Sequence, residues 1–214
     1  EPRPRDRQIA VLVTTMLESQ HLTNHPLDDE ISRRTFHQFL SRLDARKLYF
    51  LQSDIDEFGK LEKLIDNQLS DQDLTIAYTV FHRFPKRVQQ RTELVETLIK
   101  RDFDFTVNET VNQDLNLNAF PKNPAEVEDR WRRQIKYDLL VLNSKETPST
   151  ATRDRVLLQY RHFAQQIAQT TADDLLEIFL SSLASSFDPH TSYLSPPSYE
   201  RLRIRMRLNY QGIG

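Results

Sequence analysis

The chain has 214 residues, of which 38% are hydrophobic and 28% are charged. That balance is typical of a globular protein with a buried core and excludes a disordered chain. The 29 Lys and Arg residues and the 31 Asp and Glu residues leave a formal charge of -2, which gives no broad attraction to nucleic acid or to an anionic membrane. The absence of cysteine excludes disulfides and a thiol nucleophile.

Neither a membrane span nor an export signal is visible in the sequence. No apolar run approaches the roughly 18 residues that a membrane span requires. Residues 1–5 read Glu-Pro-Arg-Pro-Arg and contain no apolar core. We therefore expect that any export signal has been removed or never existed.

Apolar residues recur every three or four positions from about residue 7 to residue 187, which predicts an all-α domain of about seven to nine helices. In the first helix Ile9, Leu12, Val13 and Met16 share one face, which we expect to be buried. Trp131 is expected to anchor the core of a later helix. The other predicted core positions are Ile31, Phe36, Phe39, Leu40, Leu43, Ile55, Leu61, Leu64, Ile65, Leu74, Tyr78, Phe81, Val88, Val95, Leu98, Val127, Ile135, Leu139, Leu142, Leu175, Ile178, Phe179, Leu183 and Phe187.

Helix starts are predicted from capping residues, whose side-chain oxygens accept the first free backbone N–H groups. Pro85 lies inside a long apolar-periodic segment, so we expect a kink or a break there. The polar stretches 102–122 and 143–150 are predicted loops, and no fixed repeat is present. The predicted caps are Asp28 or Asp29, Ser53 with Asp56, Asp71 or Asp73, Asn123 with Glu126, and Thr171 with Asp174.

The apolar pattern changes near the end of the chain. After a short helix capped by Ser195, residues 203–210 alternate between polar and apolar without a fault, which predicts a half-buried strand. Two of the three glycines follow within the last three residues. We therefore expect a helical domain over 1–187, a connector over 188–202, and over 203–214 the truncated start of another domain.

Two groups of residues have the spacing or the residue types of a functional site, but a structural role explains each pattern better. His21 and His25 have the spacing of two metal ligands on a helix, but Asn24 and Pro26 disrupt the helix there, which favours a solvated helix end. We expect no metal site and no cofactor.

Asp188, His190 and Ser192 contain the residue types of a catalytic triad. Side chains at alternate positions cannot form the required hydrogen-bond relay. We expect instead a turn in which Asp188 and Thr191 bond nearby backbone groups, Pro189 fixes the backbone, and Tyr193 and Leu194 anchor it.

Two clusters of basic residues are present. Arg130, Arg132, Arg133 and Lys136 surround Trp131 but are interleaved with acidic residues, so a solvated, salt-bridged helix face is favoured over a phosphate site. The second cluster, on the polar face of the predicted strand, keeps an edge soluble or lies near an anion bound by the following turn. It comprises Arg203, Arg205 and Arg207.

Several stretches resemble the amino-terminal domain of tail-specific proteases, which are exported bacterial C-terminal processing peptidases. The first is Leu43-Asp44-Ala45-Arg46-Lys47-Leu48-Tyr49-Phe50-Leu51 followed by Asp54-Ile55. The matches cover most of the chain in the expected order. The others are Trp131-Arg132 with Lys136, Tyr160-Arg161, Asp188-Pro189-His190-Thr191, Tyr193-Leu194-Ser195-Pro196 and Gly212-Ile213-Gly214.

The resemblance implies a helical domain followed by a PDZ domain and a protease core with a serine nucleophile and a lysine base, in the periplasm. No catalytic residue can be placed on this chain, so we expect the fragment to be inactive. In PDZ domains a glycine-bearing loop holds a peptide carboxylate, and Gly212, Ile213 and Gly214 match the start of such a loop.

The resemblance therefore implies a scaffold and docking domain of a periplasmic serine endopeptidase acting on proteins with apolar C-termini. Its implied partners are protein or peptide substrates, bound through the missing PDZ and protease domains, and an adaptor lipoprotein; nucleic acid and a membrane span are not expected. The alternative is a free-standing helical protein–protein interaction module. A stop codon directly after residue 214 would favour that alternative.

Overall fold

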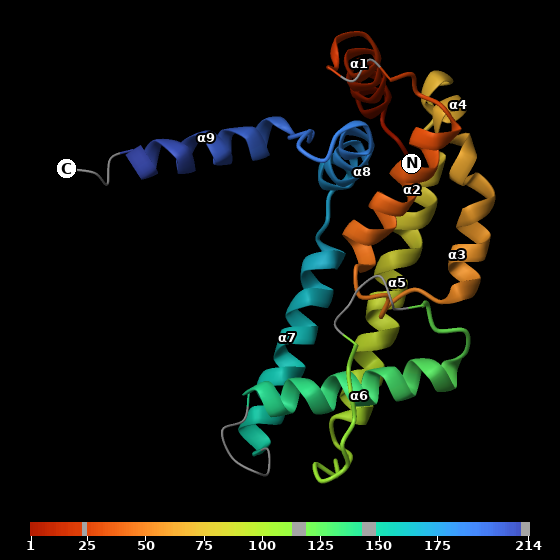
Figure 1. Cartoon of the computed structure of the whole chain (residues 1–214). Helices are drawn as coiled ribbons and strands as arrows, with labels where there is room; N and C mark the ends of the chain where they lie inside the picture. The colour runs from red at the N-terminus through yellow and green to blue at the C-terminus, as the bar shows by residue number, and fades with distance from the viewer. Residues whose placement is uncertain (23–24, 113–118, 143–148, 211–214) are drawn as a thin grey trace. The chain divides into compact units, whose positions relative to one another are not determined.

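The computed structural model describes residues 1–22, 25–112, 119–142 and 149–210, and within them it contains helices and no strand (Figure 1). The predicted all-α class is therefore confirmed. The elements are α1 Pro4–Gln20, α2 Asp29–Asp44, α3 Gln52–Phe58, the 3-10 helix η1 Gly59–Leu64, α4 Ile65–Ser70, α5 Thr75–Leu98, α6 Pro124–Leu142, α7 Thr150–Ala168, α8 Ala172–Phe187 and α9 Pro196–Tyr210.

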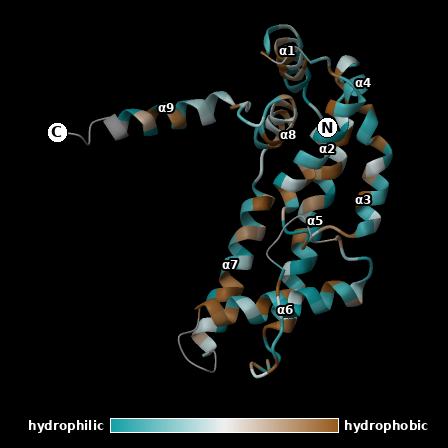
Figure 2. Cartoon of the chain, viewed as in Figure 1, coloured by the Kyte–Doolittle hydropathy of each residue, from teal (hydrophilic) through white to brown (hydrophobic). Residues whose placement is uncertain are grey.

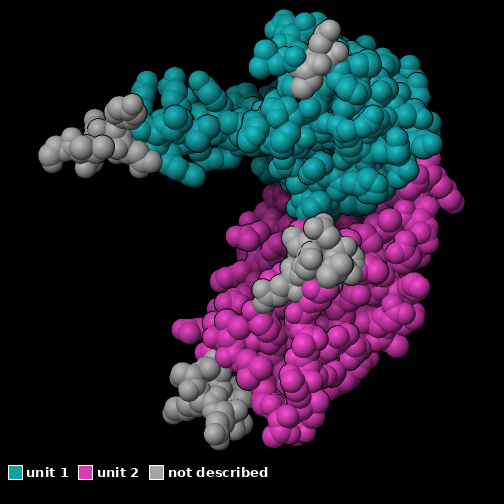
Figure 3. Space-filling view, viewed as in Figure 1, with its two compact units in different colours: residues 1–42, 61–78, 171–214 teal, residues 43–60, 79–170 magenta. Residues whose placement is uncertain are grey.

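The chain divides into two compact units (Figure 3). Unit 1 comprises residues 1–42, 61–78 and 171–214, and unit 2 comprises residues 43–60 and 79–170. Each unit is therefore built from segments that are distant in the sequence, and each has buried apolar residues of its own.

Unit 1 packs α1, α2, α4 and α8 around aromatic and aliphatic side chains. Phe39 of α2 and Phe179 of α8 meet edge to face, with their ring centroids 5.4 Å apart, a favourable geometry for aromatic pairs. The helix faces predicted for α2 and α8 are buried from Ile31 to Leu43 and from Leu175 to Phe187, although Ile178 is only half-buried. Leu64 was also predicted to be buried, which was wrong, since it is 42% exposed.

The predicted face of α1 was wrong. Leu12 and Met16 are 60% and 48% exposed, whereas the buried positions are Asp6, Ala10, Thr14 and Leu17. The buried face includes a carboxylate because Asp6 accepts hydrogen bonds from Arg3 and from the Tyr78 hydroxyl, the latter at 3.1 Å. Apolar spacing alone could not place α1, since its inward face is half polar.

Unit 2 is organised around Trp131 of α6, whose side chain is fully buried, as predicted. Val95, Leu98 and Ile99, at and just after the end of α5, and Val156 of α7 belong to the same apolar cluster. The indole ring meets Tyr160 of α7 with centroids 5.2 Å apart. In Figure 1, α6 lies across α5 and adjoins α7.

Most predicted caps are confirmed, because a cap depends only on residues three or four positions apart. Asp28 accepts N–H bonds from Glu30 and Ile31, both at 2.9 Å, and Thr171 forms a reciprocal capping box with Asp174. Asn123 Oδ1 accepts from the Glu126 N–H at 2.9 Å.

One expectation for local structure in helices was wrong, and the break that was one of the two outcomes expected at Pro85 is absent. The capping box predicted at Ser53 and Asp56 is absent, since the N-cap of α3 is Leu51, two residues earlier, and Asp54 accepts the Leu51 N–H at 2.9 Å. Pro85 does not break α5, which continues from Thr75 to Leu98. The residues on both sides of the proline are periodic and buried at Phe84 and Val88, so packing outweighs the missing donor.

The strand predicted for residues 203–210 was wrong, because these residues belong to the helix α9. A strand needs a neighbouring strand for its backbone N–H and C=O groups, and no strand lies within the described ranges. A helix satisfies those groups internally, and arginine, leucine and methionine are good helix formers. The alternating apolar and polar residues of this segment therefore lie along a helix (Figure 2).

Candidate functional site

The residues predicted to bind a peptide carboxylate, Gly212, Ile213 and Gly214, lie outside the described residues. The basic residues before them lie on α9, where Arg203, Arg205 and Arg207 are exposed. Arg203 pairs with Glu200 one turn earlier at 2.6 Å. The anion role of this cluster therefore stays a prediction.

The two histidines with metal-ligand spacing lie after the end of α1. His21 Nε2 is 3.0 Å from the Thr191 hydroxyl, and His25 Nδ1 is 2.8 Å from the carbonyl oxygen of Pro26. Both rings contact Phe187 of the same unit, with centroids 5.8 and 6.5 Å away. Throughout the described residues no group of three or more His, Cys, Asp or Glu side chains could hold a metal ion.

Asp188 and Thr191 form a hydrogen-bonded turn after α8, as the structural interpretation predicted. The Thr191 N–H donates to the Asp188 carbonyl at 3.0 Å, and the Thr191 hydroxyl donates to the Asp188 carboxylate at 3.1 Å. The Ser181 hydroxyl holds the following backbone by donating to the Tyr193 carbonyl at 2.6 Å. Leu194 is 37% exposed and is not the anchor that was expected.

Asp44 is the structural centre of the stretch Leu43–Leu51. Its buried carboxylate accepts the backbone N–H groups of Leu48, Tyr49 and Phe50, each at 2.9 Å. Burial raises the pKa of the Asp44 carboxyl, and the three N–H donors oppose that rise. The turn is tight, because Lys47 adopts a left-handed backbone with φ of 54°.

The same turn is tied to α6 within unit 2. Trp131 Nε1 donates to the Leu48 carbonyl at 3.0 Å, and Arg130 donates to the Lys47 carbonyl at 2.9 Å. The buried indole thus has the polar partner that it requires. The residues that carry the resemblance at Leu43–Leu51 and at Trp131 are joined in one hydrogen-bonded arrangement.

Asp54 forms a second buried charge centre that the sequence did not reveal. Its carboxylate has no exposed surface and binds Arg87 through two hydrogen bonds of 2.8 Å, with Arg83 as a further partner. Burial acts to raise the pKa of Asp54, but the bonds from Arg87, the Leu51 N–H and Arg83 outweigh it and lower that pKa. The two arginines lie 29 and 33 positions away, so no local pattern links them to Asp54.

The basic cluster of α6 is a salt-bridged face, as expected. Arg132 and Lys136 both bind Glu109, the latter at 2.7 Å, and Arg133 binds Asp129 at 2.7 Å. The hydrogen bonds from Arg132 and Lys136 lower the pKa of Glu109 to about 2. Glu109 was not among the predicted partners, because it belongs to the non-helical segment 101–112.

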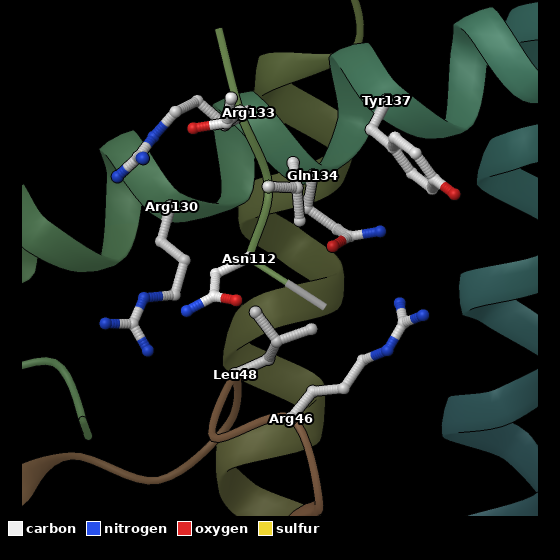
Figure 4. Close-up of a pocket in the computed structure, with 9 residues that line it drawn as sticks. Arg46, Leu48, Asn112, Arg130, Arg133, Gln134 and Tyr137 are labelled. Atoms are coloured by element: carbon white, nitrogen blue, oxygen red, sulfur yellow. The ribbon is translucent and has the colours of Figure 1, made fainter. Parts of the chain in front are cut away.

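A cavity of about 150 Å³ lies in unit 2 between the turn after Asp44, the segment 110–112 and α6 (Figure 4). Figure 4 shows Arg46 reaching toward Gln134 and Tyr137, with Arg130 and Arg133 on the other side of Asn112. Leu48 forms part of the apolar wall. Among the described lining residues there are three arginines and no Asp or Glu.

The arrangement in the described residues suits binding and support better than acid–base chemistry. The carboxylates of Asp44 and Asp54 already accept hydrogen bonds that stabilise the fold. Burial raises the pKa of Asp138. Its carboxylate accepts hydrogen bonds from the Tyr160 hydroxyl and from the Gln134 amide. None of the described helices is both long and apolar enough to cross a membrane.

Comparison with known proteins agrees with the resemblance found in the sequence. A family model described as "Tail specific protease N-terminal domain" matches residues 13–197. A protein of Haemophilus influenzae named "Tail-specific protease" is 31% identical over 202 residues, which are 94% of this chain and 29% of the relative. The chain thus spans less than a third of the length of that curated relative. It belongs to the tail-specific protease family and carries the N-terminal domain of that family.

Proposed function

We propose that this chain is the scaffold and docking domain of a periplasmic tail-specific serine endopeptidase, which degrades or processes proteins from apolar C-termini. The observation that carries the proposal is the match of the N-terminal-domain family model to residues 13–197. The curated relative is named a protease, and the chain corresponds to 29% of its length. The peptidase chemistry is therefore assigned to residues of the parent protein outside this chain.

In this proposal the catalytic serine, its lysine base and a PDZ-like domain belong to the parent protein, and the 214 residues here are inactive alone. The Asp188, His190 and Ser192 group is consistent with this, since Asp188 pairs with Thr191 in a turn. A serine nucleophile needs a base within hydrogen-bond reach. In the described residues, buried charged groups hold helices and turns together, which suits a scaffold domain.

The gene sequence beyond codon 214 gives the first test. The proposal expects the reading frame to continue into a PDZ-like sequence, then a serine-bearing segment and, further on, a lysine. A stop codon directly after Gly214 would favour the free-standing interaction module instead.

A peptidase assay gives the second test. The purified chain, incubated with an unfolded protein that ends in apolar residues, should show no cleavage by mass spectrometry, whereas the full-length parent protein should cleave it. Cleavage by the chain alone, retained in a Ser192→Ala variant and after repurification to exclude contaminants, would refute the assignment of catalysis to the remainder of the parent.

A further inference from the structure

Helix α1 carries an apolar stripe at the surface of unit 1. Ile9, Leu12, Val13 and Met16 follow the spacing i, i+3, i+4 and i+7, which places them along one side of a helix. Leu12 and Met16 are 60% and 48% exposed, and Ile9 and Val13 are half-buried. The stripe borders the face by which α1 packs on α8 and α4, so unit 1 covers only part of it.

The residues on the solvent side of the stripe carry no charge. At about 100° of rotation per residue, Gln8, Thr15 and Ser19 lie next to Leu12 on the side away from the buried face. The Thr15 hydroxyl donates to the Val11 carbonyl at 2.9 Å, and the Ser19 hydroxyl donates to the Thr15 carbonyl at 2.6 Å. Covering this surface leaves neither hydroxyl donor unpaired, and a surface without charges is typical of the centre of an interface.

The length of the stripe decides what can cover it. From Ile9 to Met16 it spans about 10 Å along the helix axis. Separate molecules that associate stably bury roughly 20–30 residues on each side, which is many times the four side chains of the stripe. A second copy of the chain or a separate protein would therefore not be held by this surface alone.

A segment of the same polypeptide needs a smaller contact. It does not lose the translational and rotational freedom that separate molecules lose on binding, and its covalent connection keeps its local concentration high. The chain corresponds to 29% of the length of the curated tail-specific protease. More than two thirds of that relative therefore lies outside the part that matches this chain.

We propose that the stripe is an interface within the parent protein, covered by the apolar face of a helix from outside residues 1–214. Leu12 and Met16 form its centre, because they are its most exposed members. A helix fits this surface, since side chains three and four positions apart form the ridges along which two helices pack. A distant segment of the parent then completes the packing of α1.

The interface rests on the proposed function, because only a longer parent protein supplies residues outside this chain. The two proposals nevertheless fail in different ways. A stop codon directly after residue 214 would contradict both. A parent protease in which the stripe is uncovered would overturn the interface alone.

The test is the rate at which a thiol in the stripe is alkylated in the full-length parent protein and in the 214-residue chain. The chain has no cysteine, so Leu12→Cys introduces one reactive site, and mass spectrometry of the labelled peptide separates it from any other thiol of the parent. We expect alkylation to be at least about 10-fold slower in the parent, because a covered thiol reacts only when the contact opens. Equal rates in the two proteins would overturn the proposal.

Arg7→Cys is the matched control. Arg7 is an exposed residue of α1 on the side opposite to the stripe, so its replacement should be alkylated equally fast in the parent and in the chain. Equal slowing at both positions would mean that the whole helix is shielded, which contradicts a specific interface. Slow alkylation of the Leu12→Cys chain that becomes fast on dilution would assign the stripe to a second copy and overturn the proposal.

A double variant of the parent tests whether the contact is apolar. Met16→Cys reports the covered state, and adding Leu12→Asp places a charge in the contact. The added charge should speed alkylation at position 16 at least about 10-fold, whereas adding Arg7→Asp should not change it. The circular dichroism signal should stay the same in both variants, because Leu12 and Arg7 are exposed in unit 1. Equal rates with either aspartate would contradict an apolar interface at Leu12.

Discussion

Helices α6 and α9 begin alike and are stabilised differently. Each starts at a proline and carries several arginines. In α6 one face is buried around Trp131, and Arg130 and Arg132 bind a carbonyl and a carboxylate from other segments. In α9 Ile204 and Met206 are 51% and 60% exposed, and Arg203 binds Glu200 of the same helix.

A helical backbone alone therefore does not show which interactions stabilise the helix. Tertiary packing supplies most helix stability in proteins, and α6 has that packing. The part of α9 from Glu200 to Arg207 is exposed throughout and depends on its internal hydrogen bonds. Three experiments test how far the contrast holds.

The largest expected effect is that of Trp131→Ala in α6. Removing a fully buried indole should lower the free energy of unfolding by about 3–5 kcal/mol, and it also leaves the Leu48 carbonyl without its donor. Urea unfolding followed by circular dichroism measures the loss. Tyr199→Ala, at a 56% exposed position of α9, is the comparison and should change stability by less than about 0.5 kcal/mol.

The second effect is a pH dependence carried by the ion pairs of α6. Because the pKa of Glu109 falls from its ordinary value of 4.5 to about 2, its stabilisation is present above pH 4.5 and is lost as the pH falls toward 2. We expect about 1 kcal/mol or less from such partly exposed pairs.

The measurement compares urea midpoints at pH 6 and pH 2.5 for the unmodified chain and for Glu109→Gln. The variant should lose less stability on acidification than the unmodified chain does. An identical loss in both proteins would mean that the pairs of Glu109 with Arg132 and Lys136 contribute nothing measurable.

The smallest effect is expected at α9. Ile204→Ala should leave the midpoint of urea unfolding unchanged, with a difference below about 0.5 kcal/mol. Amide hydrogen exchange should be fast over residues 200–207 and slow over the centre of α6, because exposed helices without packing open locally at little cost. Slow exchange in α9 of a dilute monomer would break the comparison.

The sequence predicts those features that depend on near neighbours. Caps at Asp28 and Thr171 and the buried faces of α2 and α8 follow from spacings of three or four residues. Period-2 alternation failed at 203–210, because that pattern describes how side chains would face in a sheet and does not show that a partner strand exists.

The candidate site was less accessible to sequence reasoning. Asp54 meets Arg83 and Arg87 from 29 and 33 positions away, and Glu109 meets Arg132 from 23 positions away. The cavity of unit 2 combines the turn at Arg46 with the segment 110–112 and α6. Only the fold brings these segments together, although Arg46 and Leu48 already lay within the stretch that carries the family resemblance.

The Asp44 turn also bears on how relatives of this chain should be interpreted. Its carboxylate closes a turn whose backbone carbonyls accept hydrogen bonds from Trp131 and Arg130. The residues by which the domain is most easily recognised therefore stabilise the fold. A mutated parent enzyme that had lost its peptidase activity could keep every one of them and still fold here. Matches over this stretch therefore document common ancestry, and an active hydrolase has to be recognised from other positions.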